Sequence, residues 1–341
     1  MREKMKSGSV ESSWLHILGR YHFALPLRRL GRDAYLLLLL VALCFSNVAS
    51  GSVDAQGQFL AEIPIEVPPY HGLEPKLALT YHSTPANGWI GAGWSLSGGP
   101  SYIRRVSKGG GTPRLDGSDV FLLDGMELVP CQPQSLSPSC TSSMAAFGSS
   151  NGFYSTKIEN FQRLQYASTT NTWHIWAKNG NHRVFGPDFL GTRWVLTSET
   201  DTHGNQVTYT YQLFYSSDTS EADSYLVGIS YAGRVGGGPG ALIQFYYSDR
   251  PDAVSYGAGR FLNVESKRVT GVDVLFAGKR IRVYSLNYHT SQSTSGTLLD
   301  SVQMFGKDAL VNCGVVLGDS CDSSKPQGVV TSGTSLPPRS M

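Results

Sequence analysis

The sequence is poor in charged residues, and it has almost no helical periodicity and only one strongly apolar run. Charged side chains make up 16% of the 341 residues, methionine occurs 6 times, and the formal net charge is +2. Residues 1–50 hold the basic excess, so the rest of the chain is slightly acidic. These features exclude a nucleic-acid binder, a polybasic membrane-surface protein, a coiled coil and a wholly disordered chain.

Signatures of common active sites and cofactor sites are also missing. Residues 88–99 are rich in glycine but lack the GxGxxG order of a dinucleotide site, and residues 108–112 have the wrong order for a phosphate-binding loop. The chain contains no CxxC pair and no cluster of histidines, and Ser95 in the glycine-rich segment does not lie in a GxSxG motif. The sequence therefore predicts no catalytic residue, no metal ligand, no cofactor-binding residue and no cofactor.

Two groups of acidic residues leave other chemistries open. Asp116, Asp119 and Asp124 lie close together in a glycine-containing segment. They lack the order of an EF-hand, so hairpin turns account for them better than a calcium site does. A carboxylate pair of the glycosidase kind is the other alternative, although the sequence does not fix the separation of its members. The acids available for such a pair are Glu62, Glu66, Glu74, Glu199 and Asp201.

The one strongly apolar run, residues 34–45, lies near the N-terminus. It is shorter than the roughly 20 residues of a membrane-spanning helix, it follows a cluster of arginines, and small residues come after it. This order is typical of a helical signal peptide, with cleavage predicted after Ser50 or, as second choice, after Ala55. An uncleaved anchor is the alternative, and the long basic segment also fits a start codon further downstream. We expect a secreted or periplasmic protein with no stable membrane span.

Four cysteines would remain after cleavage, because Cys44 lies inside the leader. They form two close pairs, each in a loop rich in proline, serine or glycine, and four cysteines allow three pairings. The spacing favours Cys131–Cys140 and Cys313–Cys321 as disulfides. An oxidising compartment and the lack of zinc-site spacing favour disulfides over a metal site.

Beyond the leader, short stretches alternate apolar and polar residues and are separated by Gly, Asn and Asp. Residues 207–215, for example, place valine, leucine and three tyrosines on one face. This pattern predicts an all-β fold of meandering antiparallel hairpins. Three hairpins are expected: residues 120–129 around Asp124-Gly125, residues 173–185 around Asn179-Gly180-Asn181, and residues 272–283 around Gly278.

Loops and boundaries follow from composition. Residues 130–151, 216–224 and 233–240 are predicted to be loops, because they are rich in Ser, Pro, Gly or acidic residues. Residues 313–341 carry no strand pattern and are expected to form a disordered tail. The predicted organisation is a leader over residues 1–50, a β-rich domain over residues 51–312, and that tail.

Two groups of motifs are specific enough to indicate a family. The first comprises residues 57–69 (GQFLAEIPIEVPP), 75–81 (PKLALTY), 87–96 (NGWIGAGWSL) and 103–105 (IRR). The second comprises residues 153–159 (FYSTKIE), 194–211 (WVLTSETDTHGNQVTYTY), 284–288 (YSLNY) and 298–306 (LLDSVQMFG). Together they closely resemble the SpvB/TcdB family, the N-terminal region shared by a plasmid virulence protein and the B subunits of insecticidal toxin complexes. The second group is also similar to the tyrosine/aspartate repeats of Rhs proteins.

The resemblance implies a sheet-built shell that encloses or carries a toxic polypeptide. A toxin part, a propeller region and an extended run of repeats do not fit within this chain, so we expect either the opening fragment of a shell protein or a module that pairs with one. The implied partners are other toxin-complex or Rhs-type shell proteins or a downstream toxin domain.

Three functions are therefore weighed. The leading one is a non-enzymatic, exported β-scaffold for assembly or delivery of a toxin, in virulence or in competition between bacteria. The second is a cell-surface adhesin or glycan-binding module that stacks sugars on exposed aromatic rings, and the third is an exported hydrolase with a carboxylate pair in a cleft. Burial of the tryptophans separates the first two. The tryptophans concerned are Trp89, Trp94, Trp173, Trp176 and Trp194.

Overall fold

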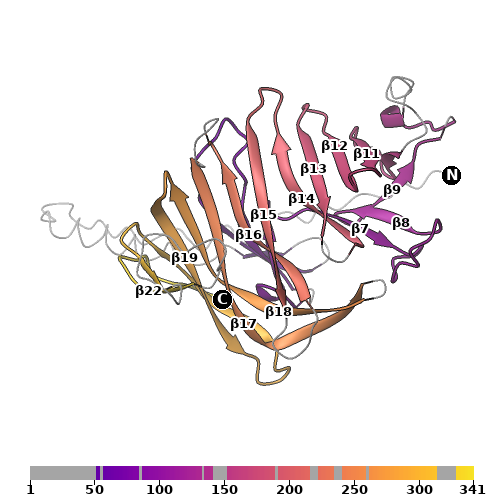
Figure 1. Ribbon diagram of the computed structural model, residues 1–341. Coiled ribbons are helices and arrows are strands. Elements are labelled where there is room, and N and C mark those ends of the chain that lie inside the picture. Colours follow the sequence, from indigo (N-terminus) through magenta and orange to yellow (C-terminus); the bar gives the residue numbers. More distant parts are fainter. Residues whose placement is uncertain are drawn as a thin grey trace, which may run out of the picture. The chain divides into compact units, whose positions relative to one another are not determined.

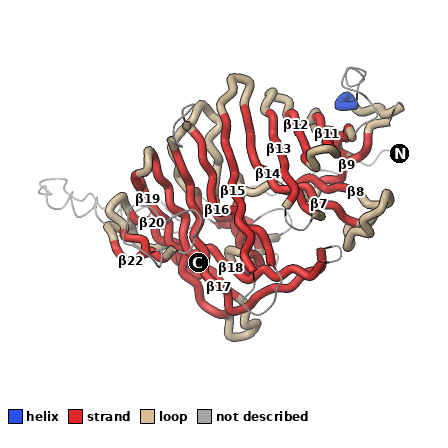
Figure 2. The backbone as a smooth tube through the Cα atoms, viewed as in Figure 1, coloured by secondary structure: helices blue, strands red, loops and turns tan. Residues whose placement is uncertain are grey.

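The computed structural model confirms the predicted all-β fold (Figures 1 and 2). It describes residues 51–53, 57–83, 87–132, 134–140, 152–188, 191–215, 222–233, 240–258, 261–312 and 328–341. Within these ranges every long element is a strand, and the one helix is the short 3-10 turn η1 (Pro138–Cys140). No helix in this part of the chain has the length and apolar character that crossing a membrane requires. The predicted helical leader lies outside the described residues.

A small antiparallel sheet is formed by the first strands, in the order β1-β2-β3-β6. Its strands are β1 (Gly51–Val53), β2 (Phe59–Pro64), β3 (Ala78–His82) and β6 (Trp94–Ser97), and a short pair, β4 (Asn87–Gly88) and β5 (Gly91–Ala92), lies before β6. Gly93 explains how these strands approach one another. Its φ is +77°, and a Cβ there would lie 2.5 Å from the ring of Tyr81. Only glycine fits both conditions.

Eight consecutive strands then close into a ring. Each pairs antiparallel with the next, and the last pairs back with the first, Trp194 lying opposite Ile103. The strands are β7 (Tyr102–Val106), β8 (Val120–Leu123), β9 (Met126–Pro130), β10 (Phe153–Thr156), β11 (Arg163–Ala167), β12 (Thr172–Trp176), β13 (His182–Pro187) and β14 (Arg193–Thr200). Strand alternation directs Trp173, Ile175 and Phe185 into the buried core, where each is 0% exposed.

The sheet leaves the ring through β14, whose second half pairs with the next strand at Ser198 opposite Thr208. A meander continues from there, seen as the red-to-orange strands of Figure 1. Its strands are β15 (Gln206–Tyr215), β16 (Ala222–Tyr231), β17 (Ala241–Ala258), β18 (Phe261–Phe276), β19 (Lys279–Thr290) and β20 (Thr297–Phe305). Strand β14 thus belongs to both the ring and the meander, which joins them into one sheet.

All three predicted hairpins are present, as the pairs β8–β9, β12–β13 and β18–β19. Two of the turns have two consecutive residues with positive φ, of 48° at Asp124 and 88° at Gly125, and of 48° at Ala277 and 75° at Gly278, whereas the β12–β13 turn has one, Gly180 at 87°. Two consecutive residues with positive φ are the signature of the hairpin turn that matches strand twist. The predicted positions of the hairpins are therefore confirmed, and so are the residues predicted to form their turns.

Two predictions about the loops and the tail need correction. The expected loop 216–224 is too long, because β16 begins at Ala222. The tail was expected to be disordered, but residues 328–341 contain β22 (Val329–Ser332) and β23 (Arg339–Ser340). Strand β22 pairs with β21 (Leu310–Asn312), and β23 pairs with β20. Strands this short carry too few residues for an alternation to be recognised in the sequence.

The first predicted disulfide is confirmed. Cys131 and Cys140 are joined, with their Cα atoms 5.5 Å apart, and the bond closes the loop between β9 and η1. The second predicted pair, Cys313–Cys321, lies outside the described residues.

Candidate functional site

The tryptophans mostly fill the core. Trp94, Trp173 and Trp194 are 6%, 0% and 3% exposed, and Trp89 and Trp176 are half-buried. Trp194 donates its Nε1 hydrogen to the side-chain and backbone oxygens of Asn171, both at 3.0 Å. This burial removes Trp94, Trp173 and Trp194 from any surface on which sugars could stack. The pattern favours a structural role for these side chains, as the scaffold hypothesis requires.

The aspartates weighed as calcium ligands each hold a turn instead. Asp119 accepts hydrogen bonds from the backbone N–H groups of Arg114 and Leu115 and from Nε of Arg105. Asp124 accepts from Ser101 Oγ and the Tyr102 N–H. Asp116 accepts from Ser118. Within the described residues, no three His, Cys, Asp or Glu side chains gather as a metal site would need.

Two of the acids weighed as a catalytic pair, Glu74 and Asp201, likewise hold turns. Glu74 accepts from the N–H groups of Tyr70 and Gly72, and these bonds lower its pKa. Asp201 accepts from Asn205 and His203 in its turn, which lowers its pKa too. None of the five acids lines either of the two larger cavities found in the described part of the protein.

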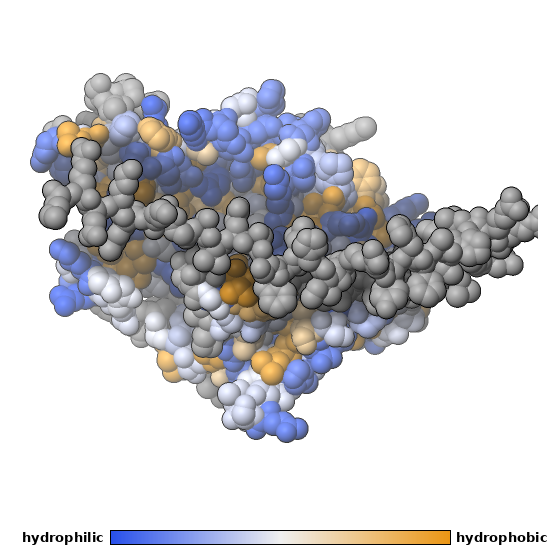
Figure 3. Space-filling model, turned by 180° about the vertical axis from the view of Figure 1, so that it is seen from behind, coloured by the Kyte–Doolittle hydropathy of each residue, from blue (hydrophilic) through white to orange (hydrophobic). Residues whose placement is uncertain are grey.

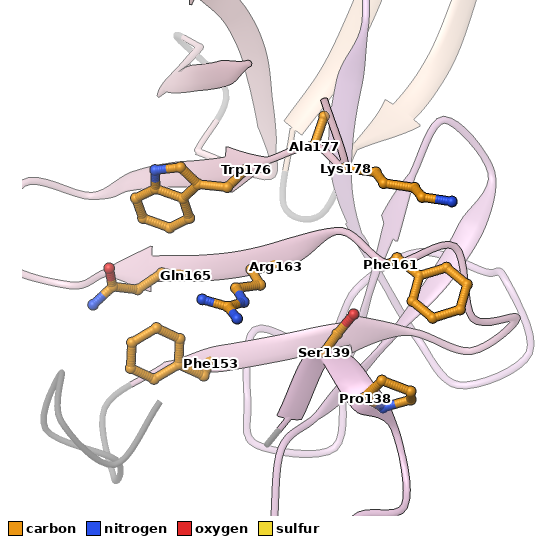
Figure 4. A pocket seen from close by; sticks show the side chains of 9 residues that line it. All are labelled: Pro138, Ser139, Phe153, Phe161, Arg163, Gln165, Trp176, Ala177 and Lys178. Atoms are coloured by element: carbon orange, nitrogen blue, oxygen red, sulfur yellow. The ribbon is translucent and has the colours of Figure 1, made fainter. Parts of the chain in front are cut away.

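The first of these cavities, of about 560 Å³, lies on the outer face of the ring (Figure 4). Phe153, Gln165 and Trp176 come from the adjacent strands β10, β11 and β12 and lie one above another. The ammonium of Lys178 lies 5.5 Å from the centre of the Phe161 ring at the far end. The lining combines aromatic rings with two cations and contains no acid.

The second cavity, of about 670 Å³, is more polar and lies between the ring and the β17–β18 hairpin. Strands β7 and β14 form one wall, and β16, β17 and β18 form the other. In Figure 1 this hairpin runs below the ring in the view shown. The charged and amide side chains that line this second cavity are those of Arg104, Arg105, Arg193, Asp223, Asn263 and Glu265. The sequence analysis assigned none of these six residues to a site, and it named Arg104 and Arg105 only as part of the family motif at residues 103–105. The six residues come from four separate strands.

Arg193 and Asp223 hold the two walls of this second cavity together. The guanidinium donates to Asp188 through Nε at 2.5 Å and to Asp223 through Nη2 at 2.7 Å. Tyr256 also donates to Asp223, at 2.6 Å. Asp223 and Asp188 raise the pKa of Arg193, so the guanidinium stays charged. With these bonds made, Asp223 acts as a fixed part of the wall.

Glu265 carries the largest acid pKa shift in this cavity. Its carboxylate accepts a hydrogen bond from Arg250 Nη1 at 2.9 Å, yet its side chain is only 20% exposed. Burial outweighs the attraction of Arg250 and raises the pKa of Glu265 from 4.5 to about 7. The folded protein therefore binds a proton at Glu265 that the unfolded chain has already released. Stability from this group is complete below pH 4.5 and is lost as the pH rises to about 7.

We predict that Glu265→Gln leaves the free energy of unfolding nearly unchanged at pH 4 and raises it by about 3 kcal/mol at pH 8. Glutamine keeps the acceptor for Arg250 but cannot ionise. Urea unfolding at both pH values measures the difference, and Glu127→Gln, in an exposed pair with Lys157, should change stability by less than about 1 kcal/mol at either. An equal effect of Glu265→Gln at pH 4 and pH 8 would contradict the raised pKa.

Comparison with known proteins identifies the family. The family model described as Salmonella virulence plasmid 65kDa B protein, SpvB, matches residues 53–227, slightly more than half of the chain. The chain belongs to the SpvB family. The match confirms the resemblance seen in the motifs between residues 57 and 211 of this chain. No curated protein matches it.

Several solved structures have a fold similar to that of this chain. The N-terminal domain of effector protein SpvB from Salmonella typhimurium strain LT2 aligns with a TM-score of 0.58 at 19% identity, over 72% of this chain and 98% of that domain. A Photorhabdus luminescens Tc holotoxin pore aligns with a TM-score of 0.61 at 18% identity. The TcdB2-TccC3 structure aligns with a TM-score of 0.59 at 17% identity.

This chain covers only 16% of each of those two toxin-complex chains, and they cover 86% and 85% of it. The fold is therefore shared with an entire SpvB domain and with one part of much longer toxin-complex chains.

Proposed function

We propose that this SpvB-family chain is a non-enzymatic, exported β-scaffold that contributes to the assembly or delivery of a toxin. The family match over residues 53–227 carries the proposal. Burial of the tryptophans and the structural use of the aspartates support it, because the motif residues build walls and turns. The proposed partners are other toxin-complex or Rhs-type shell proteins, or a toxin domain downstream.

An open strand edge at the end of the large sheet supports a partner of this kind. Strand β23 pairs with β20 on one side, and its other side has no neighbouring strand within the described residues. Met341 donates its backbone N–H to the Asp300 carbonyl at 3.0 Å. Backbone groups alternate in direction along a strand, so the N–H of Ser340 points to the open side. Unpaired groups of this kind are a template for another strand.

The test is association of the full chain with a shell protein of the TccC3 type, measured by analytical ultracentrifugation. We expect a complex at micromolar concentration that Ser340→Pro weakens at least tenfold, because proline removes the outward N–H without removing a bond to β20. Ser340→Ala keeps the N–H and is the matched control. Absence of a complex at 50 μM, the highest concentration to be tested, would overturn the proposal.

A further inference from the structure

The polar cavity between the ring and the β17–β18 hairpin exists because two neighbouring strands separate. Strands β16 and β17 pair only from Gly228 opposite Gln244 to Tyr231 opposite Ala241. The first half of β16 continues to pair with β15, whereas β17 continues with β18 into the hairpin. The space left between them is about 670 Å³, far more than the roughly 30 Å³ of one water molecule.

The open edge of β16 in this space is blocked by the protein's own side chains. The Ser224 N–H donates to the Asp223 carboxylate at 2.7 Å, and the Leu226 carbonyl accepts from the Tyr247 hydroxyl at 2.5 Å. An added peptide strand would need these same backbone groups. The cavity is therefore better suited to a small polar ligand than to a peptide.

Asn263 provides the strongest sign of a ligand. Its side chain lines the cavity, the residue is 1% exposed, and its Oδ1 has no hydrogen-bond partner, while the carboxamide interacts with the hydroxyl of the neighbouring Tyr256. Leaving a buried polar group unpaired costs about 1–3 kcal/mol, so such groups are rare in folded proteins. A carboxamide both donates and accepts, and two neighbouring hydroxyl groups of a sugar offer the matching acceptor and donor.

The charges that line the cavity favour a single negative charge on the ligand. Three guanidinium groups face two carboxyl groups. Arg193 is paired with Asp188 and Asp223, and Arg105 with Asp119. Arg104, by contrast, is exposed and makes no ion pair within the described residues, and its guanidinium lies 5.9 Å from the centre of the Tyr102 ring. It is the lining cation that remains for a ligand carboxylate.

Aromatic and apolar surface completes the lining. Trp89, Tyr256 and Leu226 contribute to the same cavity. The faces of sugar rings carry C–H groups that pack against such surface, while the ring edges carry the hydroxyls. Two acids in the lining make a dianionic phosphate less suitable than a monoanion, because like charges repel at short range.

We propose that this cavity binds an acidic saccharide, with Arg104 holding the sugar carboxylate and Asn263 holding neighbouring hydroxyls. The proposal is independent of the scaffold function, since neither residue lies at the open edge of β23. It also differs from sugar stacking on surface tryptophans, because the ligand lies between strands.

The test is calorimetric titration of the full chain with methyl glucuronide and methyl glucoside, which differ only in the carboxylate at C6. We expect the glucuronide to bind at least tenfold more tightly. Arg104→Gln should abolish this preference while retaining the weak glucoside binding, and Asn263→Ala should weaken both ligands at least tenfold. Lys279→Gln, which removes an exposed positive charge at the β18–β19 turn, is the control and should change neither.

Three outcomes would overturn the proposal. They are equal binding of the two methyl glycosides, no saturable binding of methyl glucuronide up to 50 mM, and tighter binding of glucose 6-phosphate than of methyl glucuronide. Arg104 is exposed, so its substitution tests charge recognition even where Asn263→Ala fails to fold.

Discussion

Trp173→Ala is expected to lower the free energy of unfolding by about 3–5 kcal/mol. Trp173 is 0% exposed at the centre of the ring, and its indole lies 4.9 Å from the rings of both Phe121 and Tyr154. The ring centres of Tyr166 and Trp194 lie 5.1 and 6.1 Å from that of Trp173. Five aromatic side chains from five strands thus fill one space, and the removal of the middle one leaves a cavity that the closed ring cannot collapse.

Trp176→Ala is the matched control, because it deletes the same side chain from the same strand on the opposite face. Trp176 is half-buried and stacks on His182 at 4.9 Å outside the ring. We expect the free energy of unfolding to fall by about 1 kcal/mol, which is the typical interaction energy of an aromatic pair on a surface. Urea unfolding followed by far-ultraviolet circular dichroism measures both. Similar losses for the two variants would show that the ring interior is not a closely packed core.

Local chemistry explains why the hairpins could be predicted from the sequence. Asp124-Gly125 and Ala277-Gly278 each lie between two alternating stretches, and the positive φ that such turns need is supplied within two residues. The Cys131–Cys140 pair is similar, because its sequence separation of 9 keeps the two thiols close in any folded arrangement of that loop. In each case the deciding residues are neighbours in the chain.

Closure of the ring could not be predicted in the same way. It depends on Ile103 facing Trp194, two residues far apart in sequence whose alternating patterns would be the same in an open sheet. The polar cavity has the same origin, since Arg104, Asp223 and Asn263 come together only after the ring closes and β17 leaves β16. Turn chemistry is local, whereas the ring and the cavity follow from long-range pairing.

Asp273→Asn is expected to lower the free energy of unfolding by about 3–5 kcal/mol, as the removal of one partner from a buried ion pair does. Asp273 is 0% exposed and accepts from Arg280 Nε at 2.9 Å, from Arg280 Nη2 at 2.7 Å and from the Tyr246 hydroxyl at 2.8 Å. An amide nitrogen in place of one of these oxygens would face a guanidinium that is itself only 3% exposed. The positive charge would then stay buried without its counter-charge.

Asp249→Asn, in the pair with Lys267, is the matched control, because Asp249 is 73% exposed and its loss should cost less than about 1 kcal/mol. The double variant Asp273→Leu with Arg280→Met should recover more than half of the free energy of unfolding that Asp273→Asn loses, since the double variant leaves no buried charge. No recovery in the double variant would show that geometry at these positions, and not the unpaired charge, determines stability.

The same ion pair should also decide whether β21 and β22 stay attached to the large sheet. Arg280 Nη1 donates to the Ala309 carbonyl at 2.6 Å, and Ala309 packs with Val311, Tyr246 and Val283 in a second, smaller core. Asp273→Asn releases the arginine from its position, so amide hydrogen exchange should accelerate in β21 and β22 more than in the ring. Uniform acceleration along the chain would contradict this. A difference confined to these two strands would show that one buried arginine couples the terminal segment to the sheet.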